Sequence, residues 1–209
     1  NKYQHSITST IRHPFKIPIL KKSQSNIRKE KKLFLINGSI ISSCLVAYRS
    51  LCKTISKIHN IDLHIYTGSP ESYCKKNDLL SKNIIYKGFV QTDFSDIARK
   101  YDGAFLAHSS FGSLPDIEYK TIFPTRLVDL IINKMPTIVY APKESFLSDF
   151  IREQDCANLC HDVDEIPDAL NNLFQTSRTR ILENNMKNAS SLFDADEVKR
   201  KLIDEICKK

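Results

Sequence analysis

Tryptophan is absent from this sequence, and glycine is scarce, with 5 residues among 209. The chain has no low-complexity tract and no repeat of fixed period, which excludes collagen-like, solenoid and intrinsically disordered classes. No apolar run approaches the length of about 20 residues that a membrane-spanning helix needs, and the amino end lacks a signal-peptide pattern. Because 41% of the residues are hydrophobic, we expect one folded domain with a sizeable core and an arm.

Metal-binding and redox motifs are missing as well. The 6 cysteines form no Cys-x-x-Cys pair, and no His stands at zinc-finger spacing from them. Neither a structural metal site nor a redox dithiol is therefore predicted. We expect free, buried thiols and a reducing, cytoplasmic compartment. The cysteines are Cys44, Cys52, Cys74, Cys156, Cys160 and Cys207.

The common nucleotide-binding fingerprints are also absent. No G-x-G-x-x-G follows the first apolar run, and no Walker sequence G-x-x-x-x-G-K-[ST] occurs anywhere. NAD-dependent enzymes and P-loop ATPases are poor fits for this reason. Two interpretations of Gly38 remain, a plain turn after a strand or a loop that lies close to a ligand phosphate.

The excess of positive over negative charge is confined to one end of the chain. The net charge is +7, but residues 1–32 hold nine Lys or Arg and one acidic residue, so this segment carries +8 and residues 33–209 carry −1. The segment is interpreted either as a solvated interdomain linker or as an arm that docks on an anionic membrane or on nucleic acid. Because the chain begins at Asn1 rather than Met, we expect it to be a piece of a longer polypeptide.

Past this basic arm, apolar runs alternate with segments of helical periodicity. Strands are predicted at 33–36, 62–66, 83–86, 104–107, 137–140 and 158–160. Helices are predicted at 41–58, 71–80, 94–100, 125–133, 144–152, 164–174, 178–192 and 195–207. This alternation predicts an α/β fold over residues 33–209, a doubly wound, mainly parallel six-stranded Rossmann-like sheet with helices on both faces. Ligands of such sheets bind beyond the carboxyl ends of the strands.

The predicted helix 125–133 is apolar except for one polar wedge. On a helical wheel, Thr125, Arg126, Asp129 and Asn133 share that wedge, and the other positions are predicted to be buried. At the amino end of a helix, free N–H groups and the dipole favour a phosphate, to which Thr125 adds a hydroxyl and Arg126 a charge. Asp129 would then accept hydrogen bonds from ribose hydroxyls. The alternative is a solvated stripe with an exposed Arg126–Asp129 pair.

The run Pro-Thr-Arg-Leu-Val-Asp at 124–129, closed by Asn-Lys-Met-Pro at 133–136 and a strand, resembles a known signature. That signature, P-[ST]-K-[LV]-x-[ED], belongs to the nucleotide-sugar-binding, C-terminal half of two-domain glycosyltransferases of the GT-B fold. The strand and loop at 83–90 and the strand at 101–110 resemble two further segments of this family, in the right order. The similarity covers residues 33–175.

The resemblance implies a donor site. It implies that Thr125 and Arg126 hold the donor diphosphate, with Arg126 stabilising the charge that develops on the leaving group. It also implies that Asp129 binds the ribose. The loops at the strand ends would provide the remaining donor contacts, the base lying beside Gly88, Phe89 and Val90, and the phosphates or sugar beside Ser109 and Ser110. Gly38 and Ser39, in the loop after the first strand, are further candidates for donor contacts, although the basic residues that the family often has there are absent.

Two further residues are candidates for catalysis. His108 is expected at the carboxyl end of a strand, where it serves acid–base work or simply makes a local hydrogen bond. Retaining members of the family often have two glutamates with seven residues between them. Asp129 occupies the place of the second, and Thr121 stands at the first. Glu118 and Asp116 are nearby carboxylates that could replace it, but neither has the family's spacing to Asp129.

The first functional hypothesis is the donor-binding domain of a glycosyltransferase that transfers a sugar from a nucleoside-diphosphate sugar to a glycan or lipid-linked acceptor. Its expected partners are the nucleotide sugar, the acceptor, a missing N-terminal domain against which the helix 195–207 packs, and the inner face of the membrane as a peripheral contact. No tightly bound cofactor, metal or nucleic acid is expected. The alternatives are a nucleotide-sugar epimerase domain and a non-enzymatic α/β module that docks through its basic arm.

Overall fold

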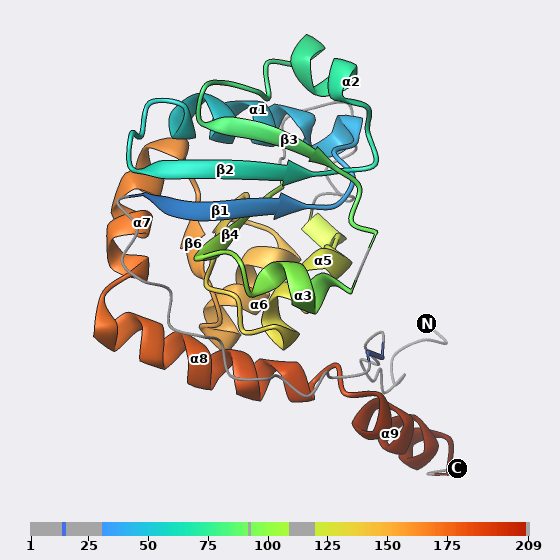
Figure 1. Ribbon diagram of the computed structural model, residues 1–209. Helices are drawn as coiled ribbons and strands as arrows, with labels where there is room; N and C mark the ends of the chain where they lie inside the picture. Colours follow the sequence, from blue (N-terminus) through green and yellow to red (C-terminus); the bar gives the residue numbers. More distant parts are fainter. Residues whose placement is uncertain (1–13, 16–30, 92, 109–119, 208–209) are drawn as a thin grey trace.

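The computed structural model describes residues 14–15, 31–91, 93–108 and 120–207, and its centre is a twisted sheet (Figure 1). The six strands are β1 (Lys32–Asn37), β2 (Ile61–Tyr66), β3 (Ile84–Gly88), β4 (Gly103–Ala107), β5 (Thr137–Tyr140) and β6 (Asn158–Cys160). They lie in the order β3-β2-β1-β4-β5-β6, and every neighbouring pair is parallel. The predicted doubly wound α/β fold is confirmed.

Helices cover both faces of this sheet, as the predicted right-handed crossovers require (Figure 1). Those between strands are α1 (Ser42–Ile55), α2 (Glu71–Lys76), α3 (Phe94–Ala98), α5 (Thr125–Ile132) and α6 (Phe146–Gln154). A 3₁₀ turn η1 (Val163–Glu165) then leads into α7 (Ile166–Leu173), α8 (Thr176–Ser191) and α9 (Ala195–Cys207). The order of the strands reverses between β1 and β4, which makes this the switch point at which such folds bind ligands.

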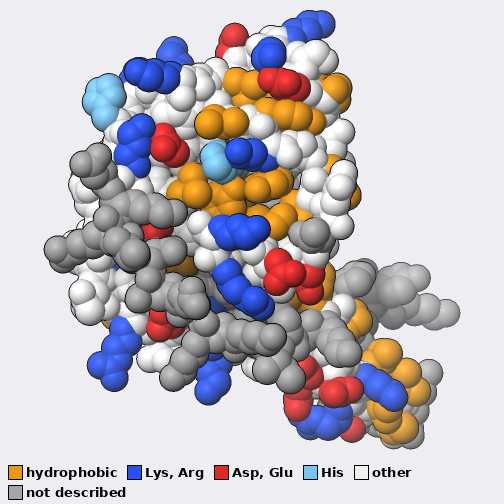
Figure 2. All heavy atoms as spheres, in the orientation of Figure 1, with side chains coloured by type: hydrophobic (Ala, Val, Ile, Leu, Met, Phe, Trp, Pro, Cys, Tyr) orange, Lys and Arg blue, Asp and Glu red, His pale blue; other side chains and the backbone are white. Residues whose placement is uncertain are grey.

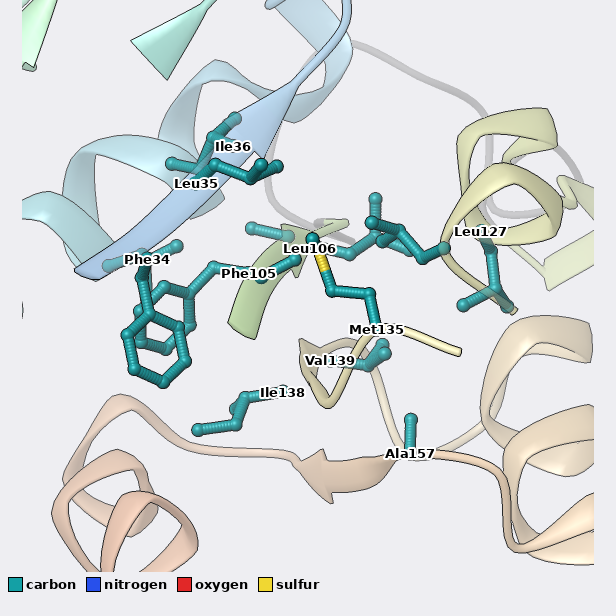
Figure 3. Close-up of a cluster of buried hydrophobic side chains, with 14 of the residues drawn as sticks. Phe34, Leu35, Ile36, Phe105, Leu106, Leu127, Met135, Ile138, Val139 and Ala157 are labelled. Carbon is teal, nitrogen blue, oxygen red and sulfur yellow. The ribbon is translucent and has the colours of Figure 1, made fainter. Parts of the chain in front are cut away.

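The core is densest around the two central strands. Phe34, Leu35 and Ile36 of β1 have no exposed surface, and every residue of β4 is buried. Because both faces of these strands are buried, their sequences are continuous apolar runs. Figure 3 shows β1, β4 and β5 side chains packed together with Leu127 of α5 and Met135. The core therefore holds the first turn of α5 beside the carboxyl ends of β1 and β4.

Most predicted elements differ at their ends from the observed ones by one to four residues, and two of these differences have a clear structural cause. The helix predicted at 71–80 ends at Lys76, because Asp78 adopts a left-handed conformation (φ 57°) that turns the chain and buries Leu79. The strand predicted at 83–86 begins at Ile84 and extends to Gly88, since its pairing with β2 continues past a bulge. Asn83 instead directs its amide to carbonyl oxygens of Ile55, Ile58 and Ile61.

Phe15 pairs with the segment that leads into α9. The backbone N–H of Phe15 donates to the carbonyl of Phe193 (2.8 Å), and the N–H of Ala195 donates to the carbonyl of Phe15 (3.2 Å). Asp194 caps α9 by accepting hydrogen bonds from the N–H groups of Asp196 and Glu197. The rest of the basic arm up to residue 30 lies outside the described residues.

Helix α9 projects from the body and carries an exposed apolar stripe (Figures 1 and 2). Val198 is buried, but Leu202, Ile203 and Ile206 are 41%, 49% and 61% exposed. The packing of this helix against a further domain stays a prediction.

The thiols are free, and five of the six are buried, with Cys207 exposed. Burial raises the pKa of Cys52, Cys156 and Cys160 to about 12, so these thiols stay protonated and unreactive at neutral pH. Across the described ranges, no helix has the length and apolar content that a bilayer crossing requires.

Candidate functional site

The switch point brings together residues from β1, α1 and α5. The guanidinium of Arg126, in the first turn of α5, crosses to the loop after β1 and donates from Nη2 to the carbonyl of Ser39 (2.8 Å). Its Nη1 donates to the hydroxyl of Tyr48 on α1 (3.1 Å). Arg126 thereby links the two helices that start on either side of the switch point.

Gly38 forms the floor beneath this guanidinium. A Cβ atom at this position would lie 3.3 Å from Cζ of Arg126, and the backbone is left-handed (φ +108°). Only glycine meets both conditions without strain. Of the two interpretations of Gly38, the close approach favours the loop beside a charged site, although contact with a phosphate stays a prediction.

The amino end of α5 begins with an exposed residue and has no capping side chain. Thr125 is exposed, and Pro124, at the N-cap position, makes no side-chain cap. The five apolar residues of α5 that the helical wheel assigns to the core are all buried. Thr125 and the amino end of the helix dipole thus lie next to Arg126 in the first turn of α5, which is the environment that an anionic group prefers.

Asp129 lies one turn further along α5. It is half-buried, and burial raises the pKa of its carboxyl. The side chains of Arg126 and Asp129 form no ion pair with each other, because the guanidinium binds Ser39 and Tyr48 instead. The exposed pair of the alternative interpretation is therefore absent. A half-buried carboxylate that is not paired with Arg126 favours the binding of a ligand that donates hydrogen bonds to it.

His108 follows β4 at the same edge of the sheet. Its backbone N–H donates to the carbonyl of Tyr140 (2.8 Å), and only 5% of the residue is exposed. The residue stands where the sequence places it, at the carboxyl end of a strand. Its part in acid–base chemistry is untested by this geometry and stays a prediction.

The loop after β3 presents an exposed aromatic ring. Phe89 is 71% exposed and packs near Gly68, at which an added Cβ would lie 3.9 Å from the ring. Gly88 is left-handed (φ +77°) and its carbonyl accepts from Thr67 (2.7 Å), which fixes the loop to the end of β2. Val90 is half-buried. These residues lie at the carboxyl edge that carries Gly38, as predicted.

Three residues predicted for the site, Ser109, Ser110 and Glu118, lie outside the described residues. The sequence analysis missed Tyr48. The feature that could have identified it is a tyrosine on the buried face of a predicted helix, because a buried hydroxyl requires a hydrogen-bond partner. A cavity of about 590 Å³ beside the start of α6, lined in part by Lys120, Lys143 and Arg152, was also missed. Among the described residues, no cluster of His, Cys, Asp or Glu is arranged to hold a metal ion.

Comparison with known proteins gives a result at the level of structure only. No model of a known protein family matches the sequence, and no curated protein matches it. The lipopolysaccharide outer core galactosyltransferase WaaB has a TM-score of 0.65 and 14% identity over 96% of this chain and 56% of its own. The chain has the fold of a GT-B glycosyltransferase domain.

Two other structures show which part of the GT-B architecture is matched. The C-terminal domain of the glycosyl transferase LpcC from Francisella tularensis is 15% identical, with a TM-score of 0.51, over 92% of this chain and 96% of that domain. HepE of Anabaena, in complex with UDP and glucose, is 11% identical, with a TM-score of 0.62, over 86% of this chain and 49% of its own. The chain thus spans about half of the longer GT-B proteins and resembles a single, C-terminal domain.

Proposed function

We propose that this chain is the donor-binding domain of a glycosyltransferase that transfers a sugar from a nucleoside-diphosphate sugar to a glycan or lipid-linked acceptor. The observation that supports the proposal most is the guanidinium of Arg126, held over Gly38 at the switch point by Ser39 and Tyr48. A cation that is held in place over a glycine, at the amino end of a helix, is an arrangement that favours the binding of a diphosphate. HepE, which has the same fold, was solved with UDP and glucose.

In this proposal the diphosphate lies between the loop after β1 and the first turn of α5. Arg126 and the helix dipole stabilise the negative charge that grows on the leaving diphosphate as the bond to the sugar breaks. Thr125 adds a hydroxyl donor, and Asp129 accepts from the ribose. This chain therefore binds the donor and stabilises its leaving group.

The base of the donor is proposed to lie against the loop after β3. Phe89 offers the face of an exposed ring at the same edge of the sheet, and an aromatic ring stacks on any nucleobase. Gly88 and Val90 frame this ring within the loop. The distance from β3 to β1 across the sheet spans two strand spacings, or about 10 Å, which a nucleoside diphosphate bridges.

The acceptor and its binding domain belong to the proposal as well. Because the chain spans 56% of WaaB and 49% of HepE, we propose that an N-terminal domain supplies the acceptor site. The apolar stripe of α9, with Leu202, Ile203 and Ile206 exposed, would pack against that domain. We also propose a cytoplasmic location, which suits the free thiols, and a peripheral contact of the basic segment with the inner face of the membrane.

A thermal-shift titration with UDP, GDP and ADP and their sugar conjugates tests the proposal. A ligand at 100 times its Kd adds about 2.7 kcal/mol to the free energy of unfolding, which raises the Tm of a domain of this size by several degrees. We expect one diphosphate to give this shift and Asp129→Ala to reduce it. The control is Asp204→Ala, which removes an exposed carboxylate from α9. The proposal is wrong if no nucleotide shifts the Tm, or if both variants respond like the wild type.

A further inference from the structure

We infer that Tyr48 is a positioning residue for the donor diphosphate, because its buried hydroxyl holds the Arg126 guanidinium in place over Gly38. The inference rests on the proposed function and adds a residue that touches no ligand. It follows from the surroundings of the Tyr48 hydroxyl, from the mobility of an unrestrained arginine, and from the neutrality of the tyrosine.

The hydroxyl of Tyr48 lies where three elements meet. Tyr48 belongs to α1 and has no exposed surface. Its hydroxyl accepts from Nη1 of Arg126 on α5 (3.1 Å) and also contacts the backbone of Ala107 at the end of β4. A buried tyrosine hydroxyl requires such partners, so its position is set by the packing of α1 rather than by solvent. This makes the hydroxyl a rigid anchor at the switch point.

Arg126 needs an anchor because its side chain is long. An arginine side chain has many rotamers and loses conformational entropy when it is fixed. Here the carbonyl of Ser39 binds Nη2 and the hydroxyl of Tyr48 binds Nη1, so both ends of the fork are held before any ligand arrives. A guanidinium has five N–H donors, and others remain to bind a ligand. A donor group that is ordered in advance binds more tightly, since the ligand need not order it.

Tyr48 can act only through orientation. Burial raises the pKa of its hydroxyl above the usual value, so the group is neutral at physiological pH and adds no charge to the site. Replacing Tyr48 with Phe removes one oxygen atom and leaves the net charge and the ring unchanged. Any loss of diphosphate affinity then reports the position of Arg126 rather than the electrostatic potential of the site.

The test measures the affinities of the full chain for UDP, GDP, ADP, the matching nucleosides and inorganic pyrophosphate by calorimetry. We expect Tyr48→Phe to weaken binding of the preferred diphosphate about tenfold, the effect of one hydrogen bond to a charged group, and to leave the nucleoside unaffected. Added to Arg126→Ala, Tyr48→Phe should cause no further loss, since both remove one interaction.

Tyr101→Phe is the matched control. Tyr101 is also buried, and its hydroxyl bonds to His64 (2.7 Å) and Tyr66 (2.9 Å), away from Arg126. It should lower the Tm yet keep wild-type diphosphate affinity. The inference is overturned if Tyr48→Phe binds the diphosphate as tightly as the wild type, or if its affinity for the nucleoside falls by the same factor as its affinity for the diphosphate. It is also overturned if Tyr48→Phe causes its full loss of affinity in the Arg126→Ala background. A wild type that binds none of the diphosphates or pyrophosphate overturns the proposed function and this inference together.

Arg126→Lys keeps the inference testable if Tyr48→Phe does not fold. Lysine keeps the charge, but a single ammonium lacks the planar fork that bonds to Ser39 and Tyr48 at once. We expect diphosphate binding to weaken at least as much as in Tyr48→Phe. Wild-type affinity in Arg126→Lys would overturn the inference, because charge alone would then be sufficient.

Discussion

Replacing Arg126 with Ala is expected to weaken the binding of a nucleoside diphosphate about 10- to 100-fold. A hydrogen bond to a charged group contributes about 1.5 to 3 kcal/mol, and each 1.4 kcal/mol is a factor of ten in Kd. The variant also removes the side chain that links the loop after β1 to α1 and α5. Calorimetric titration of the wild type and the variant measures the change, and the affinity for the bare nucleoside should stay the same.

Arg152→Ala is the control for this experiment. Arg152 is exposed on α6 and lines the cavity of about 590 Å³ beside the start of that helix, with its guanidinium bonded to Asp149 and to the carbonyl of Lys143. We expect this variant to bind the diphosphate like the wild type. If Arg152→Ala loses binding and Arg126→Ala keeps it, the diphosphate binds beside α6 and the site at the switch point is wrong.

The second large effect is expected at Gly103, the first residue of β4. A Cβ atom there would lie 2.7 Å from Cε1 of Phe34 and 2.8 Å from the carbonyl oxygen of Pro136. That carbonyl also accepts the N–H of Ala104 (2.9 Å), so neither neighbour moves freely. Overpacking of this kind costs about 1 to 3 kcal/mol or more. We expect Gly103→Val to lower the Tm by about 5 to 10 °C in a thermal melt.

Gly68→Ala provides the comparison. At Gly68 the added Cβ would lie 3.9 Å from the ring of Phe89, which is an ordinary van der Waals distance. The change in unfolding free energy should stay within about 0.5 kcal/mol. Equal melting temperatures for the two glycine variants would contradict the close packing of β4 between β1 and β5.

Much of the fold could be predicted from the sequence because the central strands β1, β4 and β5 are short apolar runs. The predicted ranges 137–140 and 158–160 match β5 and β6, and the five core positions of α5 are buried as expected. The end of α2 could not be predicted in this way. Leu79 continues the apolar pattern of a helix, but the left-handed turn at Asp78 is what brings it into the core.

The candidate site could be predicted only in part. The pattern of parallel strands is sufficient to place Gly38, Gly88, Phe89 and His108 at one edge of the sheet, because the carboxyl ends of such strands meet there. The direction of Arg126 could not be predicted, since a helical wheel places it beside Thr125 and Asp129 and carries no information on the approach of α5 to β1. Tyr48 was missed for the same reason, because its contact joins residues 78 positions apart in the sequence.

The central claim is that a nucleoside diphosphate binds at the switch point between β1 and β4, under Arg126. The most direct test is an amide NMR titration of the ¹⁵N-labelled chain with the diphosphate that gives the largest thermal shift. The account predicts the largest shifts at Gly38, Ser39, Thr125 and Arg126, with a second group in the loop after β3. Shifts confined to the cavity beside α6, or to the groove of about 550 Å³ that Asn158, Asp168 and Arg178 line in part, would contradict it.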